Sequence, residues 1–415
     1  MRRRWRTAVQ RHDDSETTMW GRIPMRCCDH GRAELAACLK SLLSGRSDDA
    51  TALAGDLETL VGPQACYRLL RRARMGIIAA LTSLPVDGRT HVLIPTFACR
   101  ALPQAILAAG MEPRLADIGQ DLNVSLSDLA QRIDDSTSAV IVAHTFAKPA
   151  DVPGIVRLCQ PRDILVIDDA AAAAGVRHEG RLLGGGGDVG IWSFAQQKSL
   201  VAGQGGLVMI NSLRLRQWMA EFHPRRPASG AAAREALWWL WRYRYRDVLP
   251  LLRRVMERFS RGERLDDLSA QSMPAPYVAM LAVQVRRLEQ ILARRANNCR
   301  ELYNRLENMR GVSVPQYYAG CSLSRFLIRT PGLKWSIEGE SFLHHPLSSY
   351  LARHGIQTAR PYFPLHLQEA YRRRASGPLP CAQEMVPELI ALPVQGIVAP
   401  ASMDAIARGI RSFFG

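Results

Sequence analysis

The stretch that decides the fold reads Ala139-Val140-Ile141-Val142-Ala143, and Ile164-Leu165-Val166-Ile167 follows it further along the chain. Both are short, continuous apolar runs rich in β-branched residues, which is typical of strands buried on both faces of a sheet. A helix-like segment, 155–159, separates them. Outward from this pair, the sequence predicts further strands at 91–95, 113–118, 189–194 and 206–210, and further helices at 101–109 and 127–133. This alternation predicts an α/β fold with a mostly parallel sheet that helices cover on both faces.

The alternation of predicted strands and helices ends after residue 212, and this change indicates how the chain is divided into domains. A stretch rich in arginine and tryptophan occupies 213–270, and an amphipathic helix pattern follows at 278–308. The rest mixes a strand at 325–328 with helices at 347–354 and 402–414. We therefore predict a large domain over 23–270 with an insertion at 213–270, and a linking helix with a smaller α+β domain over 271–415. Residues 1–22 are basic and lack a secretory pattern, so a disordered extension is expected there.

Composition limits the class of protein. The chain has 415 residues, of which 47% are apolar and 22% charged, as in an ordinary globular protein. No uninterrupted apolar run approaches the ~20 residues of a membrane-spanning helix. The nine cysteines are scattered and form no CxxC pair, so we expect neither a metal site nor a disulfide framework. A reducing, cytoplasmic compartment fits this pattern best.

The net charge of +16 is unevenly distributed. Thirteen arginines lie between Ser212 and Asp266, where they outnumber the acids by more than two to one. Within this stretch, residues 237–246 read Leu-Trp-Trp-Leu-Trp-Arg-Tyr-Arg-Tyr-Arg. Three interpretations stay open: packing against a partner subunit or the large domain, docking to a membrane surface, and capture of nucleotide phosphate. Nucleic-acid binding is not expected, because no recognition module accompanies the charge.

Three motifs carry candidate chemistry. Asp169 ends a predicted strand, where a carboxylate can pair with a cationic ring nitrogen; the alternative is a helix N-cap. Ser193 follows another strand, five residues before Lys198, so that a phosphate-binding hydroxyl and a carbonyl-reactive amine lie close together. Taken alone, Lys198 would be an ordinary surface lysine. The turn Gly203–Gly206 lets backbone pass close to a ligand.

These motifs together resemble the DegT/DnrJ/StrS aminotransferases, which are pyridoxal-phosphate enzymes of fold type I that mostly aminate keto-sugar nucleotides. The segments that carry the resemblance are Val166–Gly175, Gly187–Gly190, Ser193–Leu200, Gly203–Gly206, Ile23-Pro24, Ile94–Cys99, His144–Asp151, Pro364–Tyr371 and Ala391–Val394. The resemblance spans about residues 23 to 415, and its motifs are specific only when taken jointly. It implies a large domain with a mostly parallel seven-stranded sheet, a smaller C-terminal domain, and a homodimer.

The resemblance also implies roles for individual residues. Lys198 would form the Schiff base with pyridoxal 5′-phosphate and then move the proton between substrate and cofactor. Asp169 would pair with the pyridinium nitrogen, and Ser193 would bind the phosphate. Ala73 and Arg74 occupy the positions of a Gly-Thr pair that holds the phosphate at a helix start.

The sequence departs from the family pattern around this set. Cys99 stands where an aromatic residue usually stacks on the ring, and Ala172 replaces a glutamine beside the ring. Arg74 replaces a small hydroxyl residue, and we expect its charged side chain to bind the phosphate instead. The family's Asn-Tyr-Arg motif, whose Asn reaches the partner subunit's phosphate, aligns with Ala270-Gln271-Ser272 and is missing.

The function that the resemblance implies is transfer of an amino group, from glutamate, to a keto-sugar nucleotide or a related carbohydrate intermediate. Related dehydratases have histidine in place of the lysine, whereas this chain has Lys198. The alternative is a degenerate member without turnover, with a scaffold role at a membrane through 237–246. The missing motifs favour that alternative, and the joint presence of Asp169, Ser193 and Lys198 opposes it.

Overall fold

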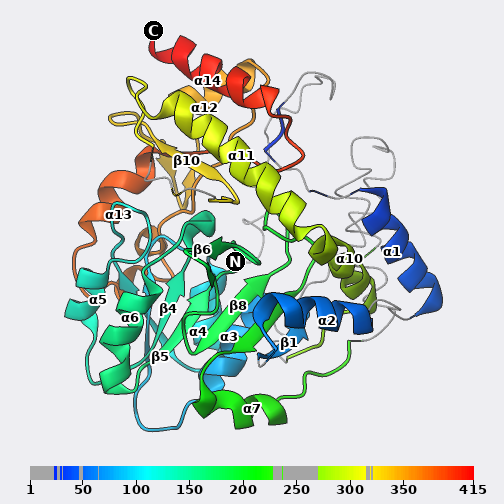
Figure 1. Cartoon of the computed structure of the whole chain (residues 1–415). Coiled ribbons are helices and arrows are strands. Elements are labelled where there is room, and N and C mark those ends of the chain that lie inside the picture. The colour runs from blue at the N-terminus through cyan, green and yellow to red at the C-terminus, as the bar shows by residue number, and fades with distance from the viewer. Residues whose placement is uncertain are drawn as a thin grey trace, which may run out of the picture.

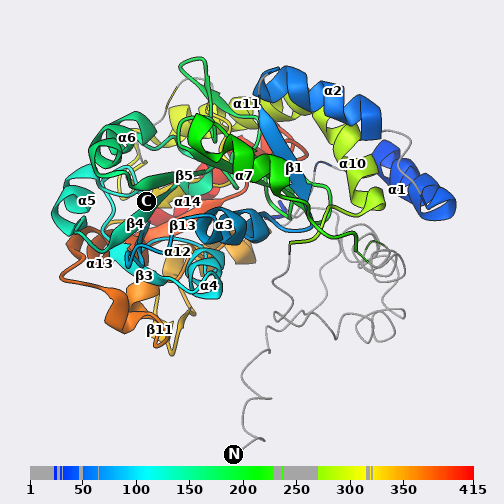
Figure 2. The same ribbon diagram turned by 90° about the horizontal axis from the view of Figure 1, so that it is seen from below.

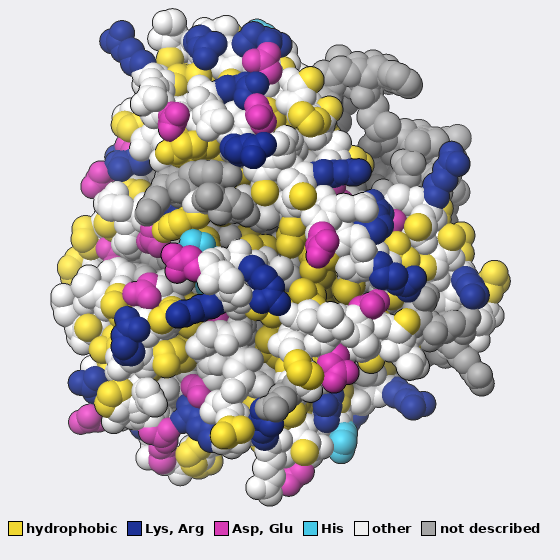
Figure 3. Space-filling view, in the orientation of Figure 1, with side chains coloured by type: hydrophobic (Ala, Val, Ile, Leu, Met, Phe, Trp, Pro, Cys, Tyr) yellow, Lys and Arg dark blue, Asp and Glu magenta, His cyan; other side chains and the backbone are white. Residues whose placement is uncertain are grey.

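The computed structural model describes residues 23–25, 29, 31–45, 50–63, 65–227, 236, 270–314, 318 and 321–415. The predictions for 1–22 and for the Trp/Arg-rich run 237–246 therefore lie outside the described residues, as does most of the 213–270 insertion. On the face shown in Figure 3, lysine and arginine side chains are spread among acidic ones. Within the described ranges, no helix combines the length and the apolar character needed to cross a membrane.

Seven strands form the central sheet, in the order β1-β9-β8-β5-β4-β2-β3. They are β1 (Cys66–Leu70), β2 (His91–Pro95), β3 (Glu112–Ala116), β4 (Thr137–Ala143), β5 (Leu165–Asp169), β8 (Val189–Ser193) and β9 (Gly206–Ile210). Of these seven, β9 alone is antiparallel to its neighbours β8 and β1. The predicted mostly parallel seven-stranded sheet of fold type I is confirmed. The sequence does not predict β1, because a charged residue, Arg68, interrupts its short apolar run.

Helices cover both faces of the sheet (Figures 1 and 2). The covering helices are α2 (Ala50–Val61), α3 (Ala73–Thr82), α4 (Ala101–Ala108), α5 (Leu126–Arg132), α6 (Val152–Cys159) and α10 (Ala275–Arg286). α3 and α4 pack on the face that carries Leu165 and Ile167 of β5. α5 and α6 pack on the opposite face, which carries Val166. Because side chains alternate along a strand, this division decides which way each residue at a strand end points.

Smaller elements complete this part of the chain. They are α1 (Arg32–Ser44), α7 (Arg216–Glu221), the hairpin β6 (Arg177–His178) and β7 (Arg181–Leu182), and the 3-10 helices η1 (Thr145–Ala147), η2 (Gln160–Arg162) and η3 (Leu213–Leu215). α1 and α2 lie against α10, at the right of Figure 1. These three helices extend the layer that covers β8 and β9.

The predicted helix over 278–308 is wrong as a single helix. Two helices occupy this region, α10 and then α11 (Leu288–Leu306), and they meet at Arg287, whose φ and ψ of −103° and 4° are not helical. An apolar repeat that continues across the junction conceals this break in the sequence. α11 then leads from the large sheet to the C-terminal elements at the top of Figure 1.

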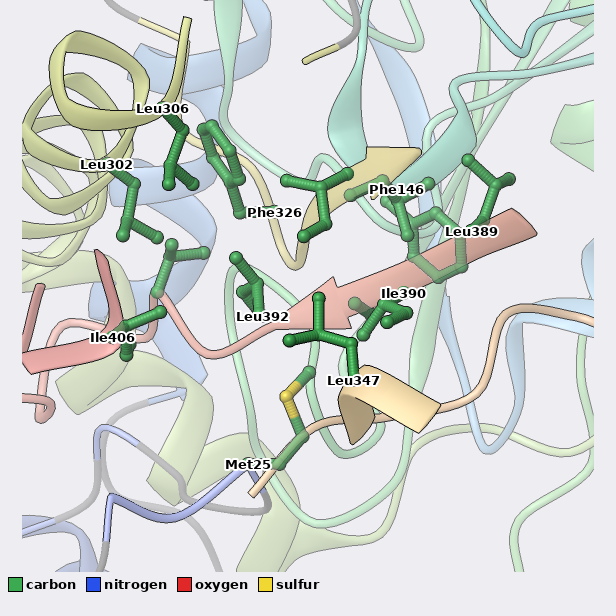
Figure 4. Close-up of a cluster of buried hydrophobic side chains, with 14 of the residues drawn as sticks. Met25, Phe146, Leu302, Leu306, Phe326, Leu347, Leu389, Ile390, Leu392 and Ile406 are labelled. Carbon is green, nitrogen blue, oxygen red and sulfur yellow. The ribbon is translucent and has the colours of Figure 1, made fainter. Parts of the chain in front are cut away.

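The C-terminal region, residues 288–415, builds a second core. Its elements are β10 (Phe326–Arg329), β11 (Ile337–Glu338), β12 (Ser341–Phe342), α12 (Pro346–Arg353), η6 (Leu365–Leu367), η7 (Arg372–Arg374), α13 (Pro380–Met385), η8 (Val386–Glu388), β13 (Leu389–Leu392) and α14 (Ala401–Phe414). β10 and β13 pair antiparallel, and α11, α12 and α14 pack on them. Figure 4 shows Phe146, from the loop after β4, lying beside Leu389 in this core. The predicted domain boundary near 270 stays a prediction.

The second core predicts a measurable difference between two isoleucines. Ile390 in β13 is fully buried, whereas Ile337 in β11 is 48% exposed. Ile390→Val leaves a cavity the size of a methylene group, so we expect a loss of about 0.5–1.5 kcal/mol in the free energy of unfolding. Ile337→Val removes the same group at the surface and should change it by less than about 0.5 kcal/mol. Urea denaturation of both variants checks this, and equal losses would show that β13 is not in the core.

Candidate active site

Two of the candidate residues, Asp169 and Ser193, lie at one edge of the sheet and on one face. Asp169 ends β5, and Ser193 ends β8, which runs parallel to β5, so both lie at the carboxyl ends of their strands. Asp169 follows Leu165 and Ile167 in alternation, so it points to the α3–α4 face. Ser193 follows Val189 and Ile191 to the same face. Ligands of parallel sheets bind at this edge, which makes it the candidate site.

The Asp169 carboxylate is buried and forms no salt bridge with a described residue. Its Oδ1 accepts a hydrogen bond from the backbone N–H of Ala171, at 2.9 Å. Burial raises the pKa of the carboxyl, although the Ala171 N–H and the charges of Lys198 and His144 act in the opposite direction. A turn follows Asp169, not a helix, so the helix N-cap interpretation is wrong. A buried carboxylate in this state is suited to a cationic ligand.

Asp168 has a different task, which the sequence did not reveal. It points to the opposite face, where its Oδ1 lies 2.7 Å from His144 Nε2. His144 Nδ1 accepts a hydrogen bond from the Ala150 N–H, so Nε2 carries the proton that is donated to Asp168. Asp168 Oδ2 accepts from the N–H groups of Gly184 and Gly186. The Asp168 carboxylate therefore holds the loops that surround the strand ends. In the sequence, the position of His144 directly after β4 was the feature that could have indicated this role.

Ser193 lies beside the start of α3 because of a glycine. Ser193 pairs with Gly206 across β8 and β9. Gly206 in turn packs so closely on the first residue of α3 that a Cβ there would lie 2.4 Å from the Ala73 Cα. The hydroxyl and the helix N-terminus therefore share one small space, which can hold a phosphate. Arg74, the second residue of α3, donates from Nη1 to Gln104 Oε1 in α4, at 3.3 Å.

Lys198 lies in the loop after β8 and is half-buried. Burial raises the pKa of Asp169 and that of Tyr362, and the charge of Lys198 opposes this effect at both, so its ammonium group is within electrostatic reach of both. The preceding residue, Gln197, has a left-handed φ of 59°, which turns the chain sharply before the lysine. The next residue, Ser199, donates from its hydroxyl to the Ala172 carbonyl at 3.0 Å. Ala172 thus contributes a backbone anchor for the lysine loop.

An aromatic group borders Lys198 on the side of the C-terminal region. Tyr362 stacks on Phe146 with ring centroids 4.8 Å apart and meets Phe97 edge-on at 5.9 Å. Burial raises the pKa of Tyr362, and the thiol of Cys99 raises it further. Cys99 itself is exposed at the rim. The sequence did not identify Tyr362 or Phe146 as site residues, because they come from distant segments and carry no local pattern.

The segment at the missing Asn-Tyr-Arg motif lies against the start of α3. The backbone N–H of Arg71 donates to the Gln271 carbonyl, and Arg71 Nη1 donates to Gln271 Oε1 at 2.9 Å. Ser272 forms a backbone bridge with Leu70. Residues 270–272 therefore lie beside the candidate phosphate position, with a neutral amide where the family has its motif.

Known proteins of one enzyme family are similar to this chain. The model of the DegT/DnrJ/EryC1/StrS aminotransferase family matches residues 33–411. A dTDP-4-dehydro-2,3,6-trideoxy-D-glucose 4-aminotransferase of Saccharopolyspora spinosa is 26% identical over 322 residues, which are 76% of this chain and 76% of that protein. A GDP-perosamine synthase of Escherichia coli O157:H7 is 26% identical over 304 residues, covering 69% of this chain and 77% of that protein.

Solved structures share the fold over nearly the whole chain. The aminotransferase TlmJ of Streptoalloteichus hindustanus superimposes with a TM-score of 0.72 at 24% identity, covering 94% of this chain and 98% of that one. A putative sugar aminotransferase, Spr1654, of Streptococcus pneumoniae in its PLP-form gives a TM-score of 0.73 at 18% identity, over 94% of this chain and 98% of that one. At these sequence identities, the similarity to the two structures shows a shared fold only.

Proposed function

The chain belongs to the DegT/DnrJ/EryC1/StrS aminotransferase family, and on that premise we propose that it aminates a nucleotide-linked keto-sugar, with glutamate as amino donor. Its cofactor is pyridoxal 5′-phosphate. The observation that carries the proposal is that Asp169 and Ser193 end neighbouring parallel strands on one face of the sheet, while the charge of Lys198, in the loop after β8, acts on Asp169. Relatives with 26% identity are named for dTDP-linked and GDP-linked sugars, which supports a sugar nucleotide as acceptor.

The residues present fit this cofactor. Burial raises the pKa of the Asp169 carboxyl, and a protonated ring nitrogen would supply it with a charged hydrogen-bond donor. Because Gly206 has no side chain, the start of α3 can pack closely on the strand that pairs with Ser193, and a hydroxyl and helix N–H groups would be available to a phosphate there. Lys198 lies close to Asp169, as a residue that must reach the other end of the same ring would.

The roles of these side chains follow from their chemistry. When bound, pyridoxal 5′-phosphate supplies an electron sink that stabilises negative charge at the donor's α-carbon. Asp169 would hold a proton on the ring nitrogen, because its buried carboxylate gains a charge-assisted hydrogen bond only while that proton is present. Lys198 Nζ would take a proton from the donor's α-carbon and return it on the other side of the transfer. Asp168, through His144, would keep the loops around Asp169 in place.

A homodimer forms part of this proposal, although the inter-subunit Asn of the family is absent. Ala270 stands at the position of that Asn and has no polar side chain, so the subunits would depend less on shared phosphate contacts. Light scattering of the holoenzyme measures its oligomeric state directly. A monomer that still catalyses transamination would contradict the proposed dimer. The degenerate alternative is disfavoured, because a chain without turnover needs no joint placement of Asp169, Ser193 and Lys198.

Gly206→Ala is expected to weaken cofactor binding roughly 10- to 100-fold, because the added methyl would displace the start of α3 from Ser193. Titration of the cofactor-free protein with pyridoxal 5′-phosphate, followed by absorbance, measures the affinity. Gly55→Ala in α2 is the matched control, since nothing lies within 4 Å of its added Cβ. An unchanged affinity in Gly206→Ala would remove the proposed phosphate position.

The function is tested by running the two halves of the reaction separately. The protein loaded with pyridoxal 5′-phosphate should change its visible spectrum on addition of glutamate, with release of 2-oxoglutarate. Adding a panel of keto-sugars linked to dTDP, GDP or UDP should then restore the spectrum, and mass spectrometry should detect the amino sugar. A protein that binds the cofactor but responds to no amino donor would support the degenerate alternative instead.

A further inference from the structure

Lys148 is a buried lysine that the reaction described above does not use. Its side chain is only 5% exposed, and its Nζ has no hydrogen-bond partner among the residues that the structure describes. The backbone around it is firmly held, since the Lys148 N–H donates to the Thr145 carbonyl, and Asn123 bonds to both Thr145 and Pro149. A buried ammonium group without a partner is costly, so its position calls for a ligand.

The amine lines a cavity between the loop after β4 and the segment that leads into β10. Thr145, Phe146 and Lys148 line it on one side, and Cys321, Leu323 and Arg325 on the other. The cavity measures about 380 Å³, which includes space open to solvent. Lys148 and Arg325 are the two charged side chains among the described residues that line it.

The cavity is electropositive. Burial lowers the pKa of Lys148, whereas Asp121 raises it, but Asp121 forms no ion pair with the amine and accepts hydrogen bonds from Asn123 instead. The thiol of Cys321 is neutral at physiological pH, because burial raises its pKa to about 12. The guanidinium of Arg325 adds a second positive charge, and two of its hydrogen bonds go to neutral oxygens, Gln197 Oε1 and the Arg360 carbonyl. Both charged side chains among the described residues that line the cavity are therefore basic.

The same cavity shares walls with the reaction site. Phe146 lines the cavity and stacks on Tyr362, which lies close to Lys198. The Arg325 guanidinium lies 5.3 Å from the Phe146 ring centroid and bonds to Gln197, the residue before Lys198. A substrate at the reacting lysine could therefore extend a short anionic arm into the cavity.

We propose that this cavity binds a carboxylate group of a substrate, with Lys148 and Arg325 as its charged partners. The inference rests on the proposed function and names a recognition element of the same site. A carboxylate would gain charge-assisted hydrogen bonds from both cations. The chain has four lysines, at 40, 148, 198 and 334, among 54 basic residues, so a lysine here is distinctive: its ammonium is a compact point charge. The carboxylate can come from the amino donor or from an acidic sugar.

The test compares Lys148→Met with Lys334→Met, which removes the same charge from an exposed position. Thermal unfolding of the holoenzyme is followed with increasing succinate, which presents carboxylates but cannot react. Succinate should raise the unfolding midpoint of wild type and Lys334→Met, and not that of Lys148→Met. Without succinate, Lys148→Met should unfold no earlier than wild type, because methionine removes an unpartnered buried amine.

Two kinetic arms identify the source of the carboxylate. If the donor supplies it, the glutamate concentration for half-maximal spectral change should rise about 10- to 100-fold in Lys148→Met, as expected for one hydrogen bond to a charged group. If the sugar supplies it, that concentration stays the same, and the KM for the acidic keto-sugar rises instead.

Equal stabilisation of Lys148→Met and wild type by succinate would overturn the proposal, as would stabilisation by inorganic phosphate but not succinate. Protection offers a second measurement on wild type alone: succinate should slow acetylation of Lys148 by an amine reagent, detected by mass spectrometry, and no protection would also overturn it. If the proposed function were wrong, the holoenzyme would show no spectral response to amino donors. The stabilisation by succinate could still be measured in that case, so the two failures are distinguishable.

Discussion

Lys198→Ala is expected to lower the rate of transamination by more than about 10³-fold and to abolish the visible band of the lysine-bound cofactor. The variant loses the covalent partner of the cofactor and the group that moves the proton, and positioned proton transfer alone contributes roughly 10²- to 10⁴-fold. Steady-state release of 2-oxoglutarate and an absorption spectrum measure the two effects.

Lys334→Ala is the control for this prediction, because Lys334 is exposed in the C-terminal region, before β11. It should retain the spectrum and the rate of the wild type. A Lys198→Ala protein that keeps the band, or that works within tenfold of wild type, would show that another amine performs the reaction.

Asp169→Asn is expected to lower kcat about 10²- to 10³-fold while the cofactor stays bound. Asparagine preserves the shape of the side chain but cannot hold a proton on the ring nitrogen. Breaking a buried charge pair costs about 3–5 kcal/mol, and each 1.4 kcal/mol corresponds to a factor of ten in rate. Steady-state kinetics at saturating donor and acceptor measures kcat, and an Asp169→Asn enzyme at wild-type kcat would remove this residue from the mechanism.

The same substitution should have the opposite effect on the stability of the cofactor-free protein. Burial raises the pKa of Asp169, so the folded chain holds this proton to higher pH than the unfolded chain does. The folded state therefore loses stability as pH rises through the folded pKa, and the loss persists at neutral pH. Cofactor-free Asp169→Asn should thus be more stable than wild type at neutral pH, and the difference should close below the ordinary aspartate pKa, about 3.9.

Urea denaturation at several pH values checks this linked effect, and it separates an electrostatic role from a structural one. If Asp169 only held the local fold together, Asp169→Asn would destabilise the cofactor-free protein at all pH values. Asp168→Asn provides the contrast. Asp168 accepts hydrogen bonds from His144, Gly184 and Gly186, so its substitution should destabilise the protein with or without cofactor.

Residues that directly follow a buried strand could be placed from the sequence alone. Asp169 and Ser193 each follow a continuous apolar run, so their place at one sheet edge is predictable from short segments. The alternation of Leu165, Val166 and Ile167 even separates the faces that the two neighbouring aspartates occupy. The local sequence pattern is therefore enough to predict the position of a side chain when a single strand determines that position.

Local pattern fails where position depends on long-range packing. Tyr362 comes within electrostatic reach of Lys198 from the C-terminal region, and Arg325 bonds to the preceding Gln197, but nothing in their flanking sequence indicates this. Lys148 looks like a loop residue and is buried only because β10 and its preceding segment cover it. The break at Arg287 is hidden for the opposite reason, since the apolar repeat continues across it and only the backbone turns.

Chemical trapping tests most directly whether Lys198 holds the cofactor. Borohydride reduction of the protein loaded with pyridoxal 5′-phosphate makes the lysine–cofactor bond permanent, and digestion followed by mass spectrometry identifies the lysine that carries it. Because the chain has four lysines, each can be examined separately. We expect the modification on Lys198 alone. Modification of Lys148 in its place, or of no lysine at all, would contradict the account.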